Sequence, residues 1–476
     1  MVADNTSEQA VEEGRCIVFI LMPERSAFNA SFVLARGLRE RGYRVLYVGP
    51  DHCSQHVLNQ GFEYEVFEYA RHPEEPEQHD GHPLIKVDFS GLRGWWRLRS
   101  FVAFERWADF ELRGRSLKRL RRLNPLLVLL DPLVWPYARL PLECGVPIIS
   151  FNTSLASSFN WHVPPAFGGL IPMEPETLVS RLRNGLAWTW LTLKRKVVFH
   201  LLPPLYSLWL LLWPRGNPLR PLRRLGGKIC WSEYGPRLQL PELVAAPAAF
   251  DFPQMLVSNG RTYLGTCVDL QRQDVDFDFS GLDGERPWIY CSLGTYSHVY
   301  KHSQRLFRAV VELARLRPEY EFVIQFGTAM DAADFAEVPS NVHLFKEVPQ
   351  LQLLQRARFF ITHGGLSSVR EAIRFAVPMM VFPCWMEQPG NAARIVYHGL
   401  GVRGDVSKVD VDSMGLLLTD LEKGDWKTSL EHMQAAFQRE DSAQVGVDFI
   451  ESFLLRQTHQ ARSQVTPKAT AELGYE

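Results

Sequence analysis

The chain has 476 residues, of which 46% are hydrophobic and 22% charged, an ordinary balance for a globular protein of two domains. Its 52 Lys and Arg nearly match its 53 Asp and Glu, so the overall charge gives no reason to expect nucleic acid as a partner. Seven scattered cysteines without CxxC spacing argue against a disulfide framework or a zinc site, and they indicate reduced thiols in a cytoplasmic protein.

The first half of the chain predicts repeated strand–helix–strand units. Largely apolar runs are typical of strands that a parallel sheet buries on both faces, and they occur at residues 16–22, 44–48, 126–130 and 146–151. The segment between the first two runs is amphipathic and ends at Gly42, so it predicts the crossover helix of a βαβ unit. Residues 1–14 are polar, and we expect a disordered leader there.

A second set of such units follows a charged, extended stretch. Its predicted strands are 288–293, 321–326, 359–362 and 379–382, and its helices 303–316 and 366–375. We therefore predict an α/β protein of two Rossmann-like, doubly wound domains that face a cleft, with ligands beyond the carboxyl ends of the strands. The predicted limits are 15–269 for the first domain, 270–286 for a linker, 287–440 for the second domain, 441–458 for a C-terminal helix and 459–476 for a disordered tail.

Residues 170–226 do not follow this alternation of strands and helices, and they are rich in Trp, Leu and Arg. Their apolar run at 197–213 contains two prolines and is shorter than the ~20 residues that span a bilayer, so we predict a helical insertion or lid. Two interpretations stay open. The insertion packs over the N-terminal sheet, or it also contacts a membrane peripherally through 190–224, where basic clusters flank the run. The second interpretation would place the cytoplasmic protein at the inner membrane face.

The stretch from 348 to 401 carries most of the expected chemistry. A strand leads into His363-Gly364-Gly365, and Ser367-Ser368 then opens a helix. Glycines let backbone amides approach an anion, and a helix N-terminus favours negative charge, which suits a diphosphate. Glu371 lies farther along the same helix, where a carboxylate can accept bonds from ribose hydroxyls. Glu387-Gln388 follows the next strand and offers the donors and acceptors that a sugar's vicinal hydroxyls need.

Together these residues resemble the donor-binding signature of the family 1 glycosyltransferases, the UDP-glycosyltransferases. The matching positions are Pro349-Gln350, Thr362 to Gly365, Ser368, Glu371, Val377-Pro378, Pro383, Glu387-Gln388 and Asn391-Ala392. The resemblance implies a GT-B fold, in which the first domain binds the acceptor and the second binds the nucleotide sugar. It also implies a donor site formed by Ser292, Gly294, Thr295, Val348, Gln350, His363, Gly364, Gly365, Ser367, Ser368, Glu371, Glu387 and Gln388.

Two positions depart from the family pattern. Glu347 stands where the family usually has a Trp that stacks on uracil, so UDP is the favoured nucleotide and thymidine diphosphate the alternative. Ala27 stands where the first loop normally carries the His that acts as general base. Asp131 matches the carboxylate that orients this His, and Glu24 lies beside the loop. These two carboxylates are our candidates for a substitute base, although Asp131 could simply cap the next segment and Glu24 could be a solvated charge.

The resemblance implies inverting transfer of a hexose, with glucose favoured, to a lipophilic small molecule. The nucleotide sugar is a co-substrate, and no metal or other cofactor is implied because protein groups would stabilise the leaving diphosphate. His162 and Trp161 are candidate acceptor contacts, while a surface role for His162 is the alternative. A second hypothesis is a catalytically silent homologue that binds nucleotide sugar and activates or scaffolds another enzyme. The missing base at Ala27 motivates it.

Overall fold

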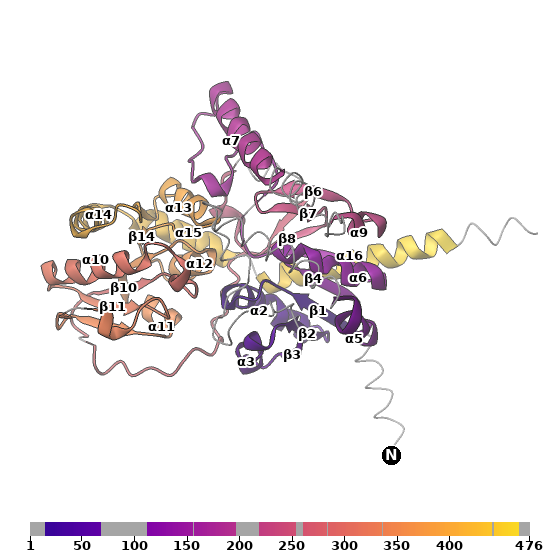
Figure 1. Cartoon of the computed structure of the whole chain (residues 1–476), viewed down its shortest axis with the longest axis horizontal. Coiled ribbons are helices and arrows are strands. Elements are labelled where there is room, and N and C mark those ends of the chain that lie inside the picture. The colour runs from indigo at the N-terminus through magenta and orange to yellow at the C-terminus, as the bar shows by residue number, and fades with distance from the viewer. Residues whose placement is uncertain are drawn as a thin grey trace, which may run out of the picture.

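A computed structural model describes residues 15–67, 112–155, 157–196, 219–253, 260–282, 284–335, 337–439 and 442–465. The predicted leader 1–14, the whole apolar run at 197–213 and the predicted tail from 466 onward therefore lie outside the described residues. Figure 1 shows two α/β units side by side, one built from the first half of the chain and the other from the second. Each unit contains one parallel sheet, as the sequence predicts.

The sheet of the first half has seven parallel strands in the order β3-β2-β1-β4-β5-β8-β9. All five residues of β1 are buried, because helices cover both faces of the sheet. The strands are β1 (Cys16–Ile20), β2 (Arg44–Gly49), β3 (Glu63–Val66), β4 (Leu127–Leu130), β5 (Ile148–Asn152), β8 (Glu242–Val244) and β9 (Arg261–Tyr263). The helices are α2 (Arg25–Glu40), α3 (Ser54–Asn59), α5 (Leu117–Leu123) and α6 (Arg139–Cys144).

The sheet of the second half has six parallel strands in the order β12-β11-β10-β13-β14-β15. This is the doubly wound order of a dinucleotide-binding fold, with its switch point between β10 and β13. The strands are β10 (Trp288–Ser292), β11 (Glu321–Gln325), β12 (Val342–Phe345), β13 (Ala357–Thr362), β14 (Met379–Val381) and β15 (Gly401–Arg403). The helices are α10 (Ser303–Leu316), α11 (Gln350–Leu354), α12 (Leu366–Arg374), α13 (Gln388–Tyr397), α14 (Val411–Lys423) and α15 (Lys427–Arg439).

The last helix, α16 (Ser442–Val465), returns to the first half of the molecule. Val447, Ile450 and Phe453 belong to the core around β1 and β4. Gly37 of α2 lies against α16, where an added Cβ would come within 2.8 Å of the Cβ of Ala443. The helix continues to Val465 and is therefore longer than the predicted 441–458. The predicted disorder is wrong for residues 459–465.

The described part of the interruption at 170–226 contains two helices, α7 (Leu178–Lys196) and α9 (Leu219–Arg224), and its first eight residues are irregular. An antiparallel hairpin of β6 (Ile229–Ser232) and β7 (Gly235–Leu238) follows, which the sequence analysis does not predict. In Figure 1, α7 projects from the body beyond both sheets. No helix among the described residues is long and apolar enough to cross a bilayer. All seven cysteines are free thiols.

Candidate active site

The predicted site residues gather at the switch points of the two sheets. In the second half, Gly294 follows β10 and His363 follows β13, the two strands between which the order reverses. In the first half, Glu24 follows β1 and Asp131 follows β4, again on either side of the reversal. Side chains at these strand ends can converge on one ligand, because the strands are parallel neighbours.

His363 is held between two glycines. A Cβ at Gly294 would lie 2.8 Å from its Cε1 atom, and a Cβ at Gly365 would lie 2.4 Å from its Nε2 atom, so neither position has room for a side chain. Gly294 also has a φ of 74°, a conformation that other residues rarely adopt. Burial lowers the pKa of His363 to about 4. The ring is therefore neutral near pH 7 and carries one N–H, for which the backbone of Ser292 and a ligand would compete.

The helix behind His363 presents an open N-terminus. Gly364 has a φ of 81° and turns the chain, and Gly365 is the N-cap residue of α12 with no side-chain cap bond. The first backbone amides of α12 thus have no side-chain acceptor, as an anion site requires. Ser368 is 8% exposed in the first turn. The Ser367 hydroxyl instead donates to the backbone oxygen of Ser26 at 3.0 Å and so reaches the first half of the molecule.

Both oxygens of Glu371 are engaged by other side chains. Arg272 donates from Nη1 to its Oε1 at 2.7 Å, and Gln350 donates from Nε2 to its Oε2 at 2.6 Å. Arg272 also pairs with Asp274 at 2.8 Å. Arg272 of the linker thus already donates a hydrogen bond to the carboxylate that we expected to bind ribose. A ribose hydroxyl would have to share these oxygens with Arg272 or use their remaining lone pairs.

The predicted sugar-binding pair lies at the start of α13. The Gln388 side chain accepts bonds from the backbone amides of Cys384 and Trp385, both at 2.9 Å, and its amide donates to the Tyr300 hydroxyl at 3.1 Å. Glu387 accepts a bond from the Tyr234 hydroxyl at 3.1 Å. Tyr234 lies in the turn of the β6–β7 hairpin, so a residue of the first half reaches the predicted sugar site. Sequence reasoning did not single out Tyr234.

Glu24, Asp131 and Glu387 form a group of interacting carboxyls. Burial, followed by the charge of Glu387, raises the pKa of Glu24 to about 8. Burial raises the pKa of Asp131 to about 6, and Glu387 adds to this effect. Burial also raises the pKa of Glu387. The interpretation of Glu24 as a solvated charge is therefore wrong, because Glu24 is partly buried beside other acids.

Asp131 also caps the segment that follows it. Its Oδ1 accepts from the backbone amide of Leu133 at 2.8 Å, and its Oδ2 accepts from the Thr153 hydroxyl at 2.9 Å. These bonds lower its pKa and so oppose the effect of burial. Asp131, which is 1% exposed, thus both caps the segment after β4 and belongs to the group of interacting carboxyls.

The remaining predicted donor residues differ in position. Ser292 accepts a bond from the backbone amide of Gly294 at 3.2 Å and shapes the turn after β10, whereas Thr295 is exposed. Val348 is 5% exposed and packs in the core of the second half. Its side chain is therefore unavailable to a ligand, and any contact would come from its backbone. Glu347, at the position of the missing Trp, forms an ion pair with Arg25 of α2.

The two candidate acceptor residues lie with α7 and not with the carboxyls. His162 is 2.9 Å from Glu176, and its side chain is 42% exposed, as in a surface ion pair. Trp161 is 50% exposed and covers Gly185 of α7. This placement agrees with the alternative of a surface His, and it leaves Ser154, Thr153 and Tyr234 nearer to the cleft carboxyls.

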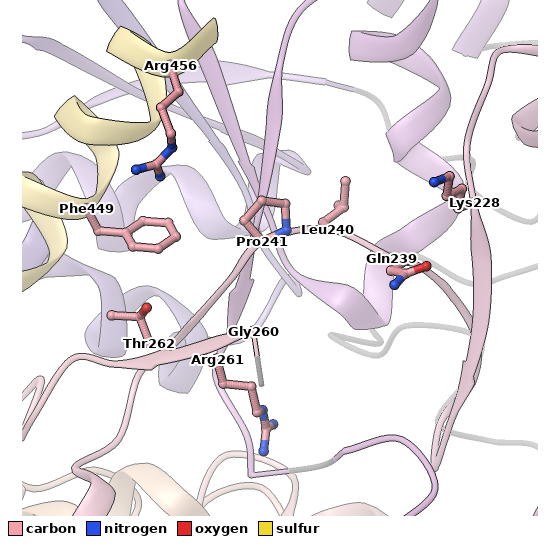
Figure 2. A pocket seen from close by; sticks show the side chains of 9 residues that line it. All are labelled: Lys228, Gln239, Leu240, Pro241, Gly260, Arg261, Thr262, Phe449 and Arg456. Atoms are coloured by element: carbon pink, nitrogen blue, oxygen red, sulfur yellow. The ribbon is translucent and has the colours of Figure 1, made fainter. Parts of the chain in front are cut away.

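A separate surface cavity of about 610 Å³ lies on the first half of the molecule (Figure 2). Lys228, Arg261 and Arg456 are among its lining residues, and Arg456 comes from α16. Arg261 is already paired with Glu242 at 2.9 Å. The cavity contains none of the predicted site residues, so it is distinct from the group of Glu24, Asp131 and Glu387.

Comparisons with known proteins agree with this fold. Residues 309–436 match the family described as "Erythromycin biosynthesis protein CIII-like, C-terminal domain". The demethyllactenocin mycarosyltransferase of Streptomyces fradiae is 24% identical over 463 residues, which cover 94% of this chain and 89% of that protein. The glycotransferase of kitacinnamycin has the same fold, with a TM-score of 0.62 and 22% identity over 92% of this chain and 98% of its own.

A spinosyn rhamnosyltransferase complexed with thymidine diphosphate also shares the fold. Its TM-score is 0.58 at 15% identity, and the match covers 92% of this chain and all of that one (100%). The expected GT-B fold is thereby confirmed. The matched C-terminal domain, the relative aligned over nearly the whole chain and the shared fold together support a glycosyltransferase that is similar to those of family 1.

Proposed function

We propose that this glycosyltransferase moves a hexose, with glucose favoured, from a nucleotide diphosphate to a lipophilic small molecule with inversion at the anomeric carbon. The observation that carries the proposal is the arrangement of His363, Gly364 and Gly365 at the open N-terminus of α12. A neutral imidazole, backbone amides and the helix dipole would meet the charge that develops on the leaving diphosphate. With these donors in place the transfer needs no metal.

The nucleotide would be UDP or thymidine diphosphate. UDP is favoured by the resemblance of the donor-binding signature, and thymidine diphosphate by the complex of the spinosyn rhamnosyltransferase, which has the same fold. Glu347 cannot stack on a base as a Trp does. Its ion pair with Arg25 places a guanidinium at that end of the site, and a planar guanidinium can stack on a base of either kind.

We assign the general base to Asp131, with Glu24 as the alternative. A base must be ionised at the working pH, and its pKa should lie close to that pH. Asp131, with a pKa of about 6, meets both conditions near pH 7, whereas Glu24, with a pKa of about 8, is mostly protonated there. In an inverting displacement Asp131 would take the acceptor proton while the acceptor oxygen attacks the anomeric carbon and the diphosphate leaves.

The direct test uses the full-length protein with UDP-glucose and thymidine-diphosphate-glucose, together with a panel of lipophilic alcohols, phenols and carboxylic acids. Mass spectrometry would detect the glycosylated acceptor. We expect nucleotide release that depends on the acceptor. Binding of nucleotide sugar without turnover on any acceptor would instead support the silent homologue that Ala27 suggests. Turnover restricted to acids would indicate an acceptor that arrives already ionised.

His363→Ala tests the donor site itself. The change removes a hydrogen bond to a charged group, and we expect nucleotide affinity to fall by ~1.5–3 kcal/mol. His432→Ala is the matched control, because His432 is an exposed His of α15 on the same half. Titration calorimetry with UDP and thymidine diphosphate measures both variants. Equal affinities for His363→Ala and the wild type would exclude His363 from the donor site.

A further inference from the structure

Helix α7 turns a stripe of large apolar side chains toward solvent. Each of the six is more than half exposed, from 53% at Leu182 to 73% at Leu178; the stripe consists of Leu178, Val179, Leu182, Leu186, Trp190 and Leu193. At 100° per residue these positions fall within about one third of the helix circumference. A contiguous apolar stripe of this kind on a globular protein marks an interaction surface.

The opposite face of α7 is fixed to the body, so the orientation of the stripe is set by packing. Trp188 is 1% exposed and donates from Nε1 to the backbone oxygen of Val163 at 2.8 Å. Asn184 donates to the backbone oxygen of Trp161 at 3.2 Å. Arg195 is anchored inward, since its Nε donates to the backbone oxygen of Glu233 at 2.9 Å. These contacts hold the helix while it projects beyond both sheets (Figure 1).

The charges of α7 indicate what covers the stripe. The helix carries five basic residues and no acidic one. Three of the five make hydrogen bonds: Arg181 with Glu176 at 2.7 Å, Arg183 with the backbone oxygen of Ile171 at 2.7 Å, and Arg195 with the body. Arg183 and Lys194 border one edge of the stripe and Lys196 borders the other, as their helical positions require. Leu and Trp flanked by Lys and Arg are the composition of a helix that lies in the interface of an anionic bilayer.

We propose that α7 is a peripheral membrane-binding element that lies along an anionic lipid surface. Its apolar stripe would enter the boundary between headgroups and acyl chains, and Lys194 and Lys196 would meet lipid phosphates. This surface lies mainly N-terminal to the segment 190–224 that the sequence suggested, and it does not depend on the identity of the transferred sugar. For a lipophilic acceptor it would bring the cleft to the phase in which that acceptor dissolves.

The experiment measures co-sedimentation of the full-length protein with vesicles of phosphatidylglycerol and phosphatidylcholine in equal parts, and with vesicles of phosphatidylcholine alone. We expect binding to the anionic vesicles that weakens with salt. The double variant Leu186→Ser/Trp190→Ser should lower the partition coefficient about tenfold or more, because it removes two side chains from the apolar contact. Its matched control is Leu316→Ser/Leu416→Ser, which changes residues 65% and 70% exposed on the second half.

Charge reversal tests the electrostatic part. Lys194→Glu/Lys196→Glu should weaken binding to anionic vesicles about tenfold or more at low salt and have little effect on neutral ones. The control is Lys408→Glu/Lys427→Glu, whose side chains are 83% and 81% exposed away from α7. Thermal denaturation checks that every variant is folded.

Three results would overturn the proposal. The wild type could fail to sediment with either vesicle, or the stripe variants could bind as well as their controls. The stripe variants could also convert a dimer to a monomer in sedimentation velocity without any change in vesicle binding. That last result would assign the stripe to a second copy of this chain.

Discussion

At the scale of single residues, the candidate site is held together by hydrogen-bonded pairs that are distant in sequence. Glu371 and Arg272 are 99 positions apart, and Glu387 and Tyr234 are 153 apart. The type and position of each predicted carboxylate followed from local sequence, since each stands in or beside a recognisable strand–turn–helix unit. Their partners could not be predicted, because a distant side chain approaches only after both sheets have formed. For the same reason the sequence could favour Asp131 over Glu24 only through the family resemblance, without placing either beside Glu387.

The first prediction concerns the pH dependence of transfer. A base works when deprotonated, so kcat/KM should rise with pH through the pKa of the base and then level off. If Asp131 is the base, the rise occurs at about pH 6; if Glu24 is the base, it occurs at about pH 8. Initial rates across pH 5 to 9, with an acceptor found in the panel test, measure the pH at the midpoint of this rise.

Two variants check this assignment. Asp131→Asn should lower kcat by ~10²–10⁴-fold while nucleotide affinity is kept, since the shape of the side chain is retained and the proton acceptor is lost. Glu24→Gln should leave the rise near pH 6 in place, because Glu24, with a pKa of about 8, is already protonated and uncharged at the pH where Asp131 titrates. Near wild-type turnover of Asp131→Asn would exclude Asp131.

At the scale of elements, the strands that sequence predicts best are those buried on both faces. β1, β10 and β13 are long apolar runs because a parallel sheet covered by helices leaves them no polar face. The strands that were missed are short or lie near sheet edges, such as β9 and β15, whose three residues include Arg. The β6–β7 hairpin was missed as well, because it contains Pro236 and little alternation. Tyr234, which lies in the turn of this hairpin, could therefore not be predicted as a site residue.

The second prediction concerns the turn between β13 and α12. Gly365 has a φ of −62°, so Ala fits its backbone and acts only through the clash of its Cβ with the His363 ring. Gly365→Ala should displace His363, weaken nucleotide binding about tenfold or more and cost ~1–3 kcal/mol of stability, as overpacking does.

Gly415→Ala provides the comparison, because Gly415 lies in α14 with open space around it. Ala there should be neutral or stabilise the protein by up to ~1 kcal/mol. Calorimetric titration and thermal denaturation measure both variants. Unchanged nucleotide affinity in Gly365→Ala would show that the position of His363 does not matter to the donor.

At the scale of the whole molecule, the two halves are joined by ion pairs of very different burial. Arg394 of α13 pairs with Asp251 of the first half at 2.6 Å, and both side chains are nearly inaccessible. Burial opposes ionisation of Asp251, yet Arg394 and Arg261 hold its pKa below the usual value. In the second pair, Arg25 and Glu347 are 53% and 44% exposed, and an ion pair in water contributes at most ~1 kcal/mol.

The third prediction tests the role of α16 in the first half. Ile450 is fully buried in the core around β1, so Ile450→Ala should lower the free energy of unfolding by ~2–5 kcal/mol. Leu455 on the same helix is 62% exposed, and Leu455→Ala should change stability by less than ~0.5 kcal/mol. Denaturant titration followed by circular dichroism measures both. Equal stabilities of the two variants would contradict the placement of α16 in this core.

The return of α16 to the first half makes the nucleotide-sugar half an insert within the acceptor half. The core around β1 draws on residues before the linker and on Val447, Ile450 and Phe453 of α16, with Tyr296 contributed by the second half. The sheet of the second half, by contrast, comes from one continuous piece of chain between them. A chimera that exchanges donor specificity between relatives should therefore replace 287–439 and retain the native α16. An exchange of everything after the linker would pair a foreign α16 with Gly37 of α2, where only a small residue on α16 fits.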